Sequence, residues 1–321
     1  MIATITDCAP SMGAVTTRSP LDSVCFVNAD IESILPAAGT LTRQAIAAQP
    51  DWLRGVPIDQ RFPEGARILF TGCGTSFHAA QTGGDAVQAL ELVLRPRTAD
   101  LLVCVSHEGE TELTVEAARA FDGPVWLVTG KPDSALGAIA DEVIVATPEV
   151  EQSWCHTASY TCAVAAIEAL HGHDLSWLPD AVAAADGFAA SAHERFVIAG
   201  AGRDWPTAQE AALKLREGSF VAAEPHHTEQ LLHGHLAAID ENVRAFVLEG
   251  AGRAAERAAE AVAALHELGC DATLVPTRHP VPDIVPFQKL AVALADARGV
   301  NPDRIRRDDE RWARAAARHK G

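Results

Sequence analysis

The stretch RILFTGCGTS, residues 67–76, decides the fold of this sequence. It is an apolar run that ends in a Gly-x-Gly turn, and SFHAAQTGGDAVQALELVL (76–94) follows with the apolar spacing of a helix. The pattern predicts a short buried strand over 66–72, then a tight turn and a helix. A strand, a glycine turn and a helix N-terminus in this order can bind an anion, because free backbone N–H groups point at the ligand.

The same unit returns in the second half as RFVIAGAGRD, residues 195–204. Neither turn completes GxGxxG, so a dinucleotide site is poorly supported, and either turn alone is more often an ordinary tight turn. Further strand-like runs alternate with alanine-rich helical stretches, which favours parallel sheets covered by helices. These runs are 101–107, 125–130, 142–148, 244–252 and 270–276.

An internal duplication of one α/β unit explains this order most economically. We therefore predict an α/β fold of two flavodoxin-like halves, each a parallel sheet flanked by helices. Residues 1–50 read as a helical lead-in, 51–175 as the first domain, and 190–321 as the second domain with a short charged tail.

Composition excludes several classes of protein. The 321 residues are 48% hydrophobic, which supplies a core, and the formal net charge is −17, which disfavours nucleic acid as a partner. No apolar run is long enough to cross a membrane, and the N-terminal sequence lacks the pattern of a secretory signal. The seven cysteines include no CxxC pair, which argues against a disulfide framework or a zinc knot. We expect a cytoplasmic protein without a cofactor or metal.

Hydroxyl side chains follow two of the predicted strands. Thr75 and Ser76 come after the first glycine turn, and Ser106 and Thr111 flank His-Glu-Gly-Glu after the next strand. Loops of a parallel sheet that leave the carboxyl ends of the strands meet at one edge, where ligands bind. The alternative is that these residues only cap the following helices.

The motifs TGCGTS and VSHEGET resemble the sugar isomerase (SIS) domain family. Their tandem arrangement is similar to the isomerase half of the glucosamine-6-phosphate synthases, without the glutaminase domain, and the similarity covers roughly residues 50–307. In that family the two loops bind a sugar phosphate. The resemblance implies substrate binding by Cys73, Gly74, Thr75, Ser76, Ser106, His107, Gly109, Glu110 and Thr111.

The second half carries acid–base candidates in ALKLREGSF and EPHHTEQLLHGH. Glu217 follows Lys214 by one helical turn, and taken alone it reads as a solvated glutamate paired with a nearby cation. The histidines are too close in sequence for a familiar zinc motif, and exposed histidines near a loop are the plainer reading.

The resemblance assigns more specific roles to this segment. It implies that Glu217 is the base that moves a proton between C1 and C2 of the sugar. It implies that His233, sixteen residues later as in the family, assists ring opening and is donated by the neighbouring chain of a homodimer. Lys214 is implied among the substrate-binding residues.

Two departures separate this sequence from the family. Glu108 replaces a serine that binds phosphate, and Arg307 stands where the synthases have a lysine near the C-terminus. Arginine stays protonated and cannot form an imine, so amination is not expected, and Arg307 is retained as a binding candidate. We expect an aldose–ketose isomerase or a deaminase of a sugar phosphate or amino sugar. The alternative is a sugar-binding module without turnover.

Overall fold

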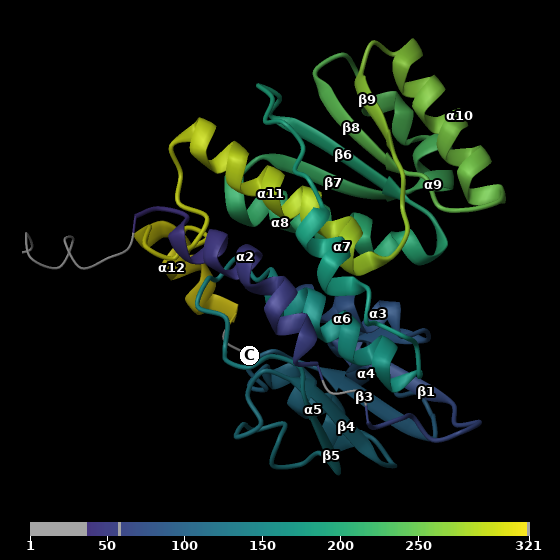
Figure 1. Ribbon diagram of the computed structural model, residues 1–321, viewed down its shortest axis with the longest axis vertical. Coiled ribbons are helices and arrows are strands. Elements are labelled where there is room, and N and C mark those ends of the chain that lie inside the picture. The colour runs from purple at the N-terminus through teal and green to yellow at the C-terminus, as the bar shows by residue number, and fades with distance from the viewer. Residues whose placement is uncertain (1–36, 57–58, 320–321) are drawn as a thin grey trace, which may run out of the picture. The chain divides into compact units, whose positions relative to one another are not determined.

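The first half of the chain folds into a five-stranded parallel sheet in the order β2-β1-β3-β4-β5 (Figure 1). The computed structural model describes residues 37–56 and 59–319. This strand order is that of flavodoxin-like sheets. The strands are β1 (Ile68–Gly72), β2 (Ala86–Gln88), β3 (Leu101–Val105), β4 (Val125–Thr129) and β5 (Glu142–Val145).

The second half forms a four-stranded parallel sheet in the order β7-β6-β8-β9. Its central strands match the predicted runs, and its order repeats that of the first sheet without a fifth strand. The strands are β6 (Arg195–Gly200), β7 (Ala222–His227), β8 (Val243–Leu248) and β9 (Asp271–Val275). The predicted α/β class with parallel sheets flanked by helices is confirmed.

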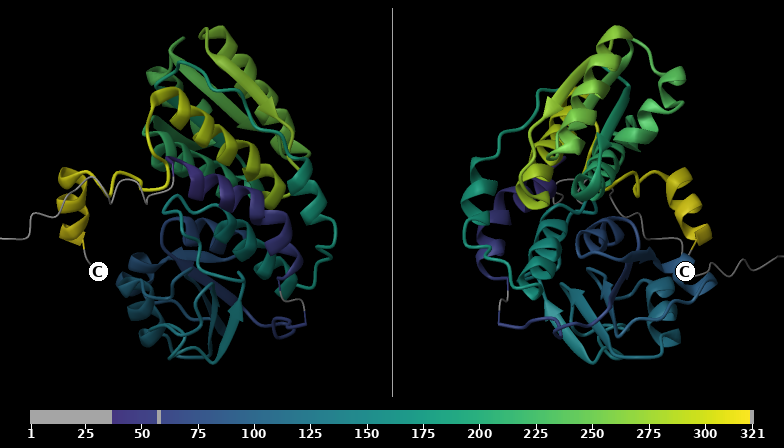
Figure 2. Two further views of the ribbon diagram at one scale, coloured as in Figure 1. Left: turned by 60° about the vertical axis from the view of Figure 1, so that its left-hand side comes forward. Right: turned by 90° about the vertical axis from the view of Figure 1, so that its right-hand side faces the viewer.

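Helices connect the strands of each sheet, as parallel pairing requires. Among them, α8 of the second half packs against both α11 and α3, and so reaches the first half of the chain. In chain order the helices are α2 (Thr40–Arg54), α3 (Thr75–Thr82), α4 (Ala89–Leu94), α5 (Glu112–Ala120), α6 (Ala158–Leu170), α7 (Leu178–Ala184), α8 (Trp205–Ser219), α9 (Thr228–Leu232), α10 (Arg253–Glu267), α11 (Pro280–Arg298) and α12 (Glu310–Ala316). Figure 2 shows α12 in yellow, joined to α11 by an irregular segment.

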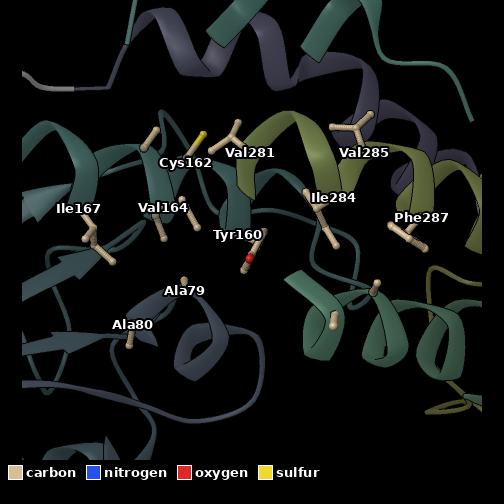
Figure 3. Packing of buried hydrophobic residues seen from close by; sticks show 14 of the residues in the cluster. Ala79, Ala80, Tyr160, Cys162, Val164, Ile167, Val281, Ile284, Val285 and Phe287 are labelled. Carbon is tan, nitrogen blue, oxygen red and sulfur yellow. The ribbon is translucent and has the colours of Figure 1, made fainter. Parts of the chain in front are cut away.

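One hydrophobic core serves both sheets. Phe70 of β1 and Phe246 of β8 belong to the same buried cluster, and helices α6, α8 and α11 supply most of the residues between them. Figure 3 shows part of this cluster, including Ala79 of α3, Tyr160 of α6 and Ile284 of α11. Because the described residues from 37 to 319 belong to one compact unit and one cluster joins both sheets, the division into SIS domains at 51–175 and 190–321 stays a prediction.

Two predicted segments differ from the structure. The helical pattern over 76–94 is interrupted at Gly83 and Gly84, and the short edge strand β2 separates α3 from α4. A side chain at Gly83 would lie 2.5 Å from the ring of Phe70, so the chain turns there beside a core residue. The strand β7 lies at the start of the histidine-rich segment, where the polar composition gave no indication of a strand. Of the predicted lead-in, α2 is helical, and residues 1–36 lie outside the described part of the chain.

Across the described residues, no helix is both long and apolar enough to span a membrane.

Candidate functional site

A cavity of about 750 Å³ opens at the carboxyl ends of β1 and β3. Its size suits a small organic ligand. The loops after the two strands meet there, as expected for adjacent strands of a parallel sheet. Side chains from the second half complete the wall. Predicted residues that line the cavity are Cys73, Thr75, Ser76, Ser106, His107, Glu110, Thr111, Glu217 and Arg307, and Glu108 lines it too.

The loop after β1 is shaped by Gly74, which precedes the first residue of α3. Its φ of +55° lies in the left-handed region, which favours glycine over other residues. The backbone N–H groups of Phe77 and His78 donate to the Gly74 carbonyl, so the turn runs directly into the helix. Thr75 and Ser76 therefore stand in the first turn of α3, at the edge of the cavity.

The loop after β3 is held by backbone contacts at both ends. The Gly109 N–H donates to Ser106 Oγ at 3.2 Å, and the Leu136 N–H donates to the Gly109 carbonyl at 3.0 Å. The Gly130 N–H donates to the His107 carbonyl at 2.9 Å. These bonds fix the loop so that the side chain of Thr111, at the N-cap of α5, faces the cavity.

His107 and His156 form a pair of buried imidazoles in the wall of the cavity. Their ring centroids are 5.2 Å apart, and His107 Nε2 accepts the Glu151 N–H at 2.9 Å. Burial lowers the pKa of each to about 4. Both rings are therefore neutral at physiological pH and offer hydrogen bonds rather than positive charge to a ligand.

Helix α8 places a buried charge network beneath the cavity. Lys214 Nζ lies 2.6 Å from Glu217 Oε2 and 3.4 Å from Glu210 Oε1, and Glu210 and Lys214 are fully buried. Thr75 ties the network to the first half, because its hydroxyl donates to Glu210 at 3.2 Å and accepts from Lys214 at 3.2 Å. His78 Nδ1 contacts the other Glu210 oxygen at 2.7 Å.

Opposite charges keep this network ionised despite its burial. Burial alone would lower the pKa of Lys214, but Glu210 and Glu217 raise it above its ordinary value. Burial alone would likewise raise the pKa of Glu210, but the Lys214 charge and the His78 contacts hold it below its usual range. Lys214 does not line the cavity, but it contacts Glu217 and Thr75, which do.

Glu217 lines the cavity, and one of its two carboxylate oxygens is paired. Its Oε2 accepts from Lys214, and no described residue donates to Oε1. The side chain is 24% exposed, in contrast to its two fully buried partners on the same helix. A carboxylate that lines a pocket and has one oxygen without a donor is able to accept a proton there.

The C-terminal segment brings Arg307 to the cavity. The buried Asp303 carboxylate accepts the N–H and hydroxyl of Thr42 at 2.8 and 2.7 Å, which anchors the segment to the start of α2. The Trp154 N–H donates to the Asp303 carbonyl at 3.1 Å, and the Arg307 guanidinium lies 3.6 Å from the Trp154 ring centroid. Arg307 thus reaches the site over an aromatic surface.

His233 is the predicted catalytic residue that this chain does not bring to the cavity. It follows α9, its side chain is 71% exposed, and its Nε2 lies 2.7 Å from Glu229 Oε1. The neighbouring His226 and His235 face each other at 4.5 Å between ring centroids. Within 37–56 and 59–319, no group of three or more His, Cys, Asp or Glu side chains is arranged to hold a metal ion.

An aspartate, Asp204, follows the second glycine turn. Asp204 follows the turn in the position that Ser76 has in the first half, and its Oδ2 accepts the Thr277 hydroxyl at 2.9 Å. The Gly250 N–H donates to the same threonine oxygen at 3.0 Å. Burial raises the pKa of Asp204. An acidic side chain in this place makes the second turn unsuited to an anionic ligand.

Sequence reasoning missed several residues of the site. Glu210 could have been found, because Glu210, Lys214 and Glu217 follow at spacings of four and three and share one helix face. Trp154 and His156 gave no such signal, since they lie in an irregular segment before α6. Their place in the wall depends on packing between distant parts of the chain.

Comparisons with known proteins agree with this arrangement. The SIS domain matches residues 190–276. A glutamine–fructose-6-phosphate aminotransferase (isomerizing) from Pyrococcus horikoshii is 30% identical over 301 residues, covering 75% of this chain and 50% of the relative. The chain therefore spans about half the length of such relatives. The chain contains an SIS domain over residues 190–276 and resembles the isomerase half of these aminotransferases.

Solved structures share the fold. Glucosamine-6-phosphate deaminase from Thermotoga maritima superposes with a TM-score of 0.68 at 20% identity, covering 83% of this chain and 97% of the deaminase. Tagatose-6-phosphate ketose/aldose isomerase from Escherichia coli superposes with a TM-score of 0.69 at 19% identity, covering 84% and 97%.

Proposed function

We propose that this protein is an aldose–ketose isomerase or a deaminase that acts on a sugar phosphate or an amino sugar. The observation that carries the proposal is the placement of Glu217. Glu217 lines the same cavity as the hydroxyl loops after β1 and β3, and its Oε1 has no donor among the described residues. Relatives and structural neighbours named as sugar-phosphate aminotransferases, isomerases and deaminases support the same reaction class.

The chemistry requires one base near C1 and C2 of an opened sugar. Interconversion of aldose and ketose passes through an enediol, so a proton is removed from one carbon and returned to its neighbour. Glu217 would carry that proton on its free oxygen, while Lys214 stabilises the negative charge from the other side. Thr75, Ser76, Ser106 and Thr111 would orient the sugar through their hydroxyls and nearby backbone N–H groups.

Ring opening would use His233 from a second subunit. In this chain His233 lies outside the cavity and is largely exposed, which leaves it available to a neighbouring molecule. A homodimer with shared sites would then be needed for turnover of a cyclic sugar. We also propose a cytoplasmic location, in keeping with the metabolic reaction.

A mixing experiment tests the shared site. Glu217→Gln and His233→Ala should each be inactive, while random exchange of subunits between them should restore about a quarter of the parental site activity, because half of the dimers carry one intact site. Failure of the mixture to exceed either variant, with dimer exchange verified by mass, would contradict the shared site.

A second candidate function is sugar binding without turnover. It is favoured by Arg307, which replaces a lysine of the synthases and cannot form an imine. In this case the cavity would bind the same class of ligand, but Glu217 would transfer no proton.

Two measurements in sequence separate these functions. Thermal unfolding with sugar phosphates, amino sugars and neutral sugars should first identify ligands, because a ligand of the native state raises the melting temperature. The best ligands are then incubated with the protein in deuterated water. Incorporation of deuterium at C2 supports the enzyme, whereas binding without exchange supports the binding module. The enzyme proposal fails if no sugar that binds exchanges the relevant hydrogen, which is at C2 in an aldose and at C1 in a ketose.

A further inference from the structure

Two charged side chains that line the cavity, Glu108 and Arg307, have no ion-pair partner among the described residues. Glu110 lies 3.1 Å from Lys131, and Glu217 lies 2.6 Å from Lys214. Glu108 has no hydrogen bond or ion pair with any described residue, although it lines the cavity. On the described part of the chain, the Arg307 guanidinium likewise has no carboxylate partner and lies over the Trp154 ring.

We propose that Glu108 is a specificity residue that binds a protonated amine of the substrate. The inference rests on the proposed function and narrows its ligand class to a sugar derivative that carries both an ammonium group and an anionic group. Glu108 would pair with the ammonium group, and Arg307 would attract the anion.

The position of Glu108 explains why this loop is unsuited to an anion. Glu108 lies between Ser106 and Thr111 in the loop after β3, where the hydroxyls of these two residues would otherwise face a phosphate. Glu108 is an exposed residue of the cavity wall, and a carboxylate a few ångströms from a phosphate repels it. The neutral imidazoles of His107 and His156 supply no positive charge to offset it.

An ammonium group fits the same surroundings. It pairs with a free carboxylate through charge-assisted hydrogen bonds, and the neighbouring hydroxyls can accept its remaining N–H groups. Arg307 reaches the cavity from the C-terminal segment, so the anion would lie beside that segment rather than within the loop after β3.

Calorimetric titration with related ligands tests the proposal. The probes are glucosamine 6-phosphate, fructose 6-phosphate, N-acetylglucosamine 6-phosphate and glucosamine, at about pH 6.5 so that the free amine is protonated. The variant is Glu108→Gln, which keeps the shape and removes the charge. The control is Glu112→Gln, the same change at an exposed position of α5 outside this cavity.

The parent protein should bind glucosamine 6-phosphate about tenfold more tightly than fructose 6-phosphate or the acetylated sugar, the usual worth of one charge-assisted hydrogen bond. Weaker binding of glucosamine than of glucosamine 6-phosphate would show that the protein also binds the phosphate group, as proposed. Glu108→Gln should abolish the preference for the amine, and Glu112→Gln should retain it.

The proposal is overturned if the parent binds fructose 6-phosphate at least as tightly as glucosamine 6-phosphate. It is also overturned if Glu108→Gln leaves the ratio of the two affinities unchanged, or if glucosamine binds as tightly as its phosphate. In these cases the proposed isomerase function still stands. Failure of every sugar in the thermal panel and in this set to bind would instead overturn the ligand class itself.

Discussion

Replacement of Lys214 by methionine should destabilise the protein strongly, because Lys214 balances two carboxylates on α8. The ammonium group is fully buried, 2.6 Å from Glu217 and 3.4 Å from Glu210. Glu217 is partly exposed to solvent, but without Lys214 the buried Glu210 carboxylate keeps hydrogen-bond partners only in His78 and Thr75. Removal of one partner from a buried pair costs about 3–5 kcal/mol of unfolding free energy.

Thermal and urea unfolding measure this cost. The expected loss corresponds to a fall in melting temperature of roughly 6–20 °C for a domain of this size. The double variant Glu210→Gln/Lys214→Met should regain about 1–3 kcal/mol relative to Lys214→Met alone, since it leaves no unpaired buried charge. Glu210→Gln alone supplies the fourth corner of the cycle.

The pH dependence gives an independent check. Without Lys214 the pKa of the buried Glu210 should rise, so the variant should regain stability relative to the parent as the pH falls from about 7 to about 5. A loss below about 1 kcal/mol for Lys214→Met, or strict additivity in the cycle, would refute the view that this lysine neutralises Glu210.

Two further outcomes follow from the same structure. Burial lowers the pKa of His107 and His156 to about 4, below the ordinary value of roughly 6.5, so the stability they contribute is complete above pH 6.5 and is lost as the pH falls toward 4. The loss is on the order of 3 kcal/mol for one such imidazole. When the melting temperature is measured as the pH is lowered, it should therefore fall less steeply in His156→Gln than in the parent. An equally steep fall would count against burial of the neutral imidazole as the cause. Asp303→Ala removes the buried acceptor of the Thr42 N–H and hydroxyl, and should cost about 3 kcal/mol in urea unfolding and weaken ligand binding through Arg307; full retention of both would contradict its role as the anchor of the tail.

The sequence predicted the fold well wherever apolar periodicity was strong. Buried strands such as β1, β3 and β8 follow from uninterrupted apolar runs, and parallel pairing follows from the helices between them. The edge strand β2 was missed because it is short and lies within a stretch with helical spacing, and β7 was missed because much of it is polar. Such strands are decided by pairing with a neighbour rather than by local composition.

The candidate site divides in the same way. The hydroxyl loops could be placed at one edge because adjacent parallel strands bring their carboxyl ends together, and Thr75 and Thr111 do line one cavity. Trp154 and His156 could not be placed, since their irregular segment is held at the cavity by residues distant in sequence, such as Asp303 and His107. The burial of Glu210 and Lys214 depends on contact between α8 and α3, which local sequence does not encode.

Exchange of the C2 hydrogen with solvent by Glu217→Gln tests the central claim most directly. The amide keeps the shape of the side chain and its contact with Lys214 but cannot accept a proton from carbon. With a sugar that the parent protein binds and exchanges, the rate should fall about 10²–10⁴-fold, the usual contribution of a general base. Ligand affinity should change far less. Glu224→Gln, the same change at an exposed carboxylate on β7, should exchange at the parental rate. If Glu217→Gln exchanges deuterium as fast as the parent, Glu217 is not the base and the proposed mechanism is wrong.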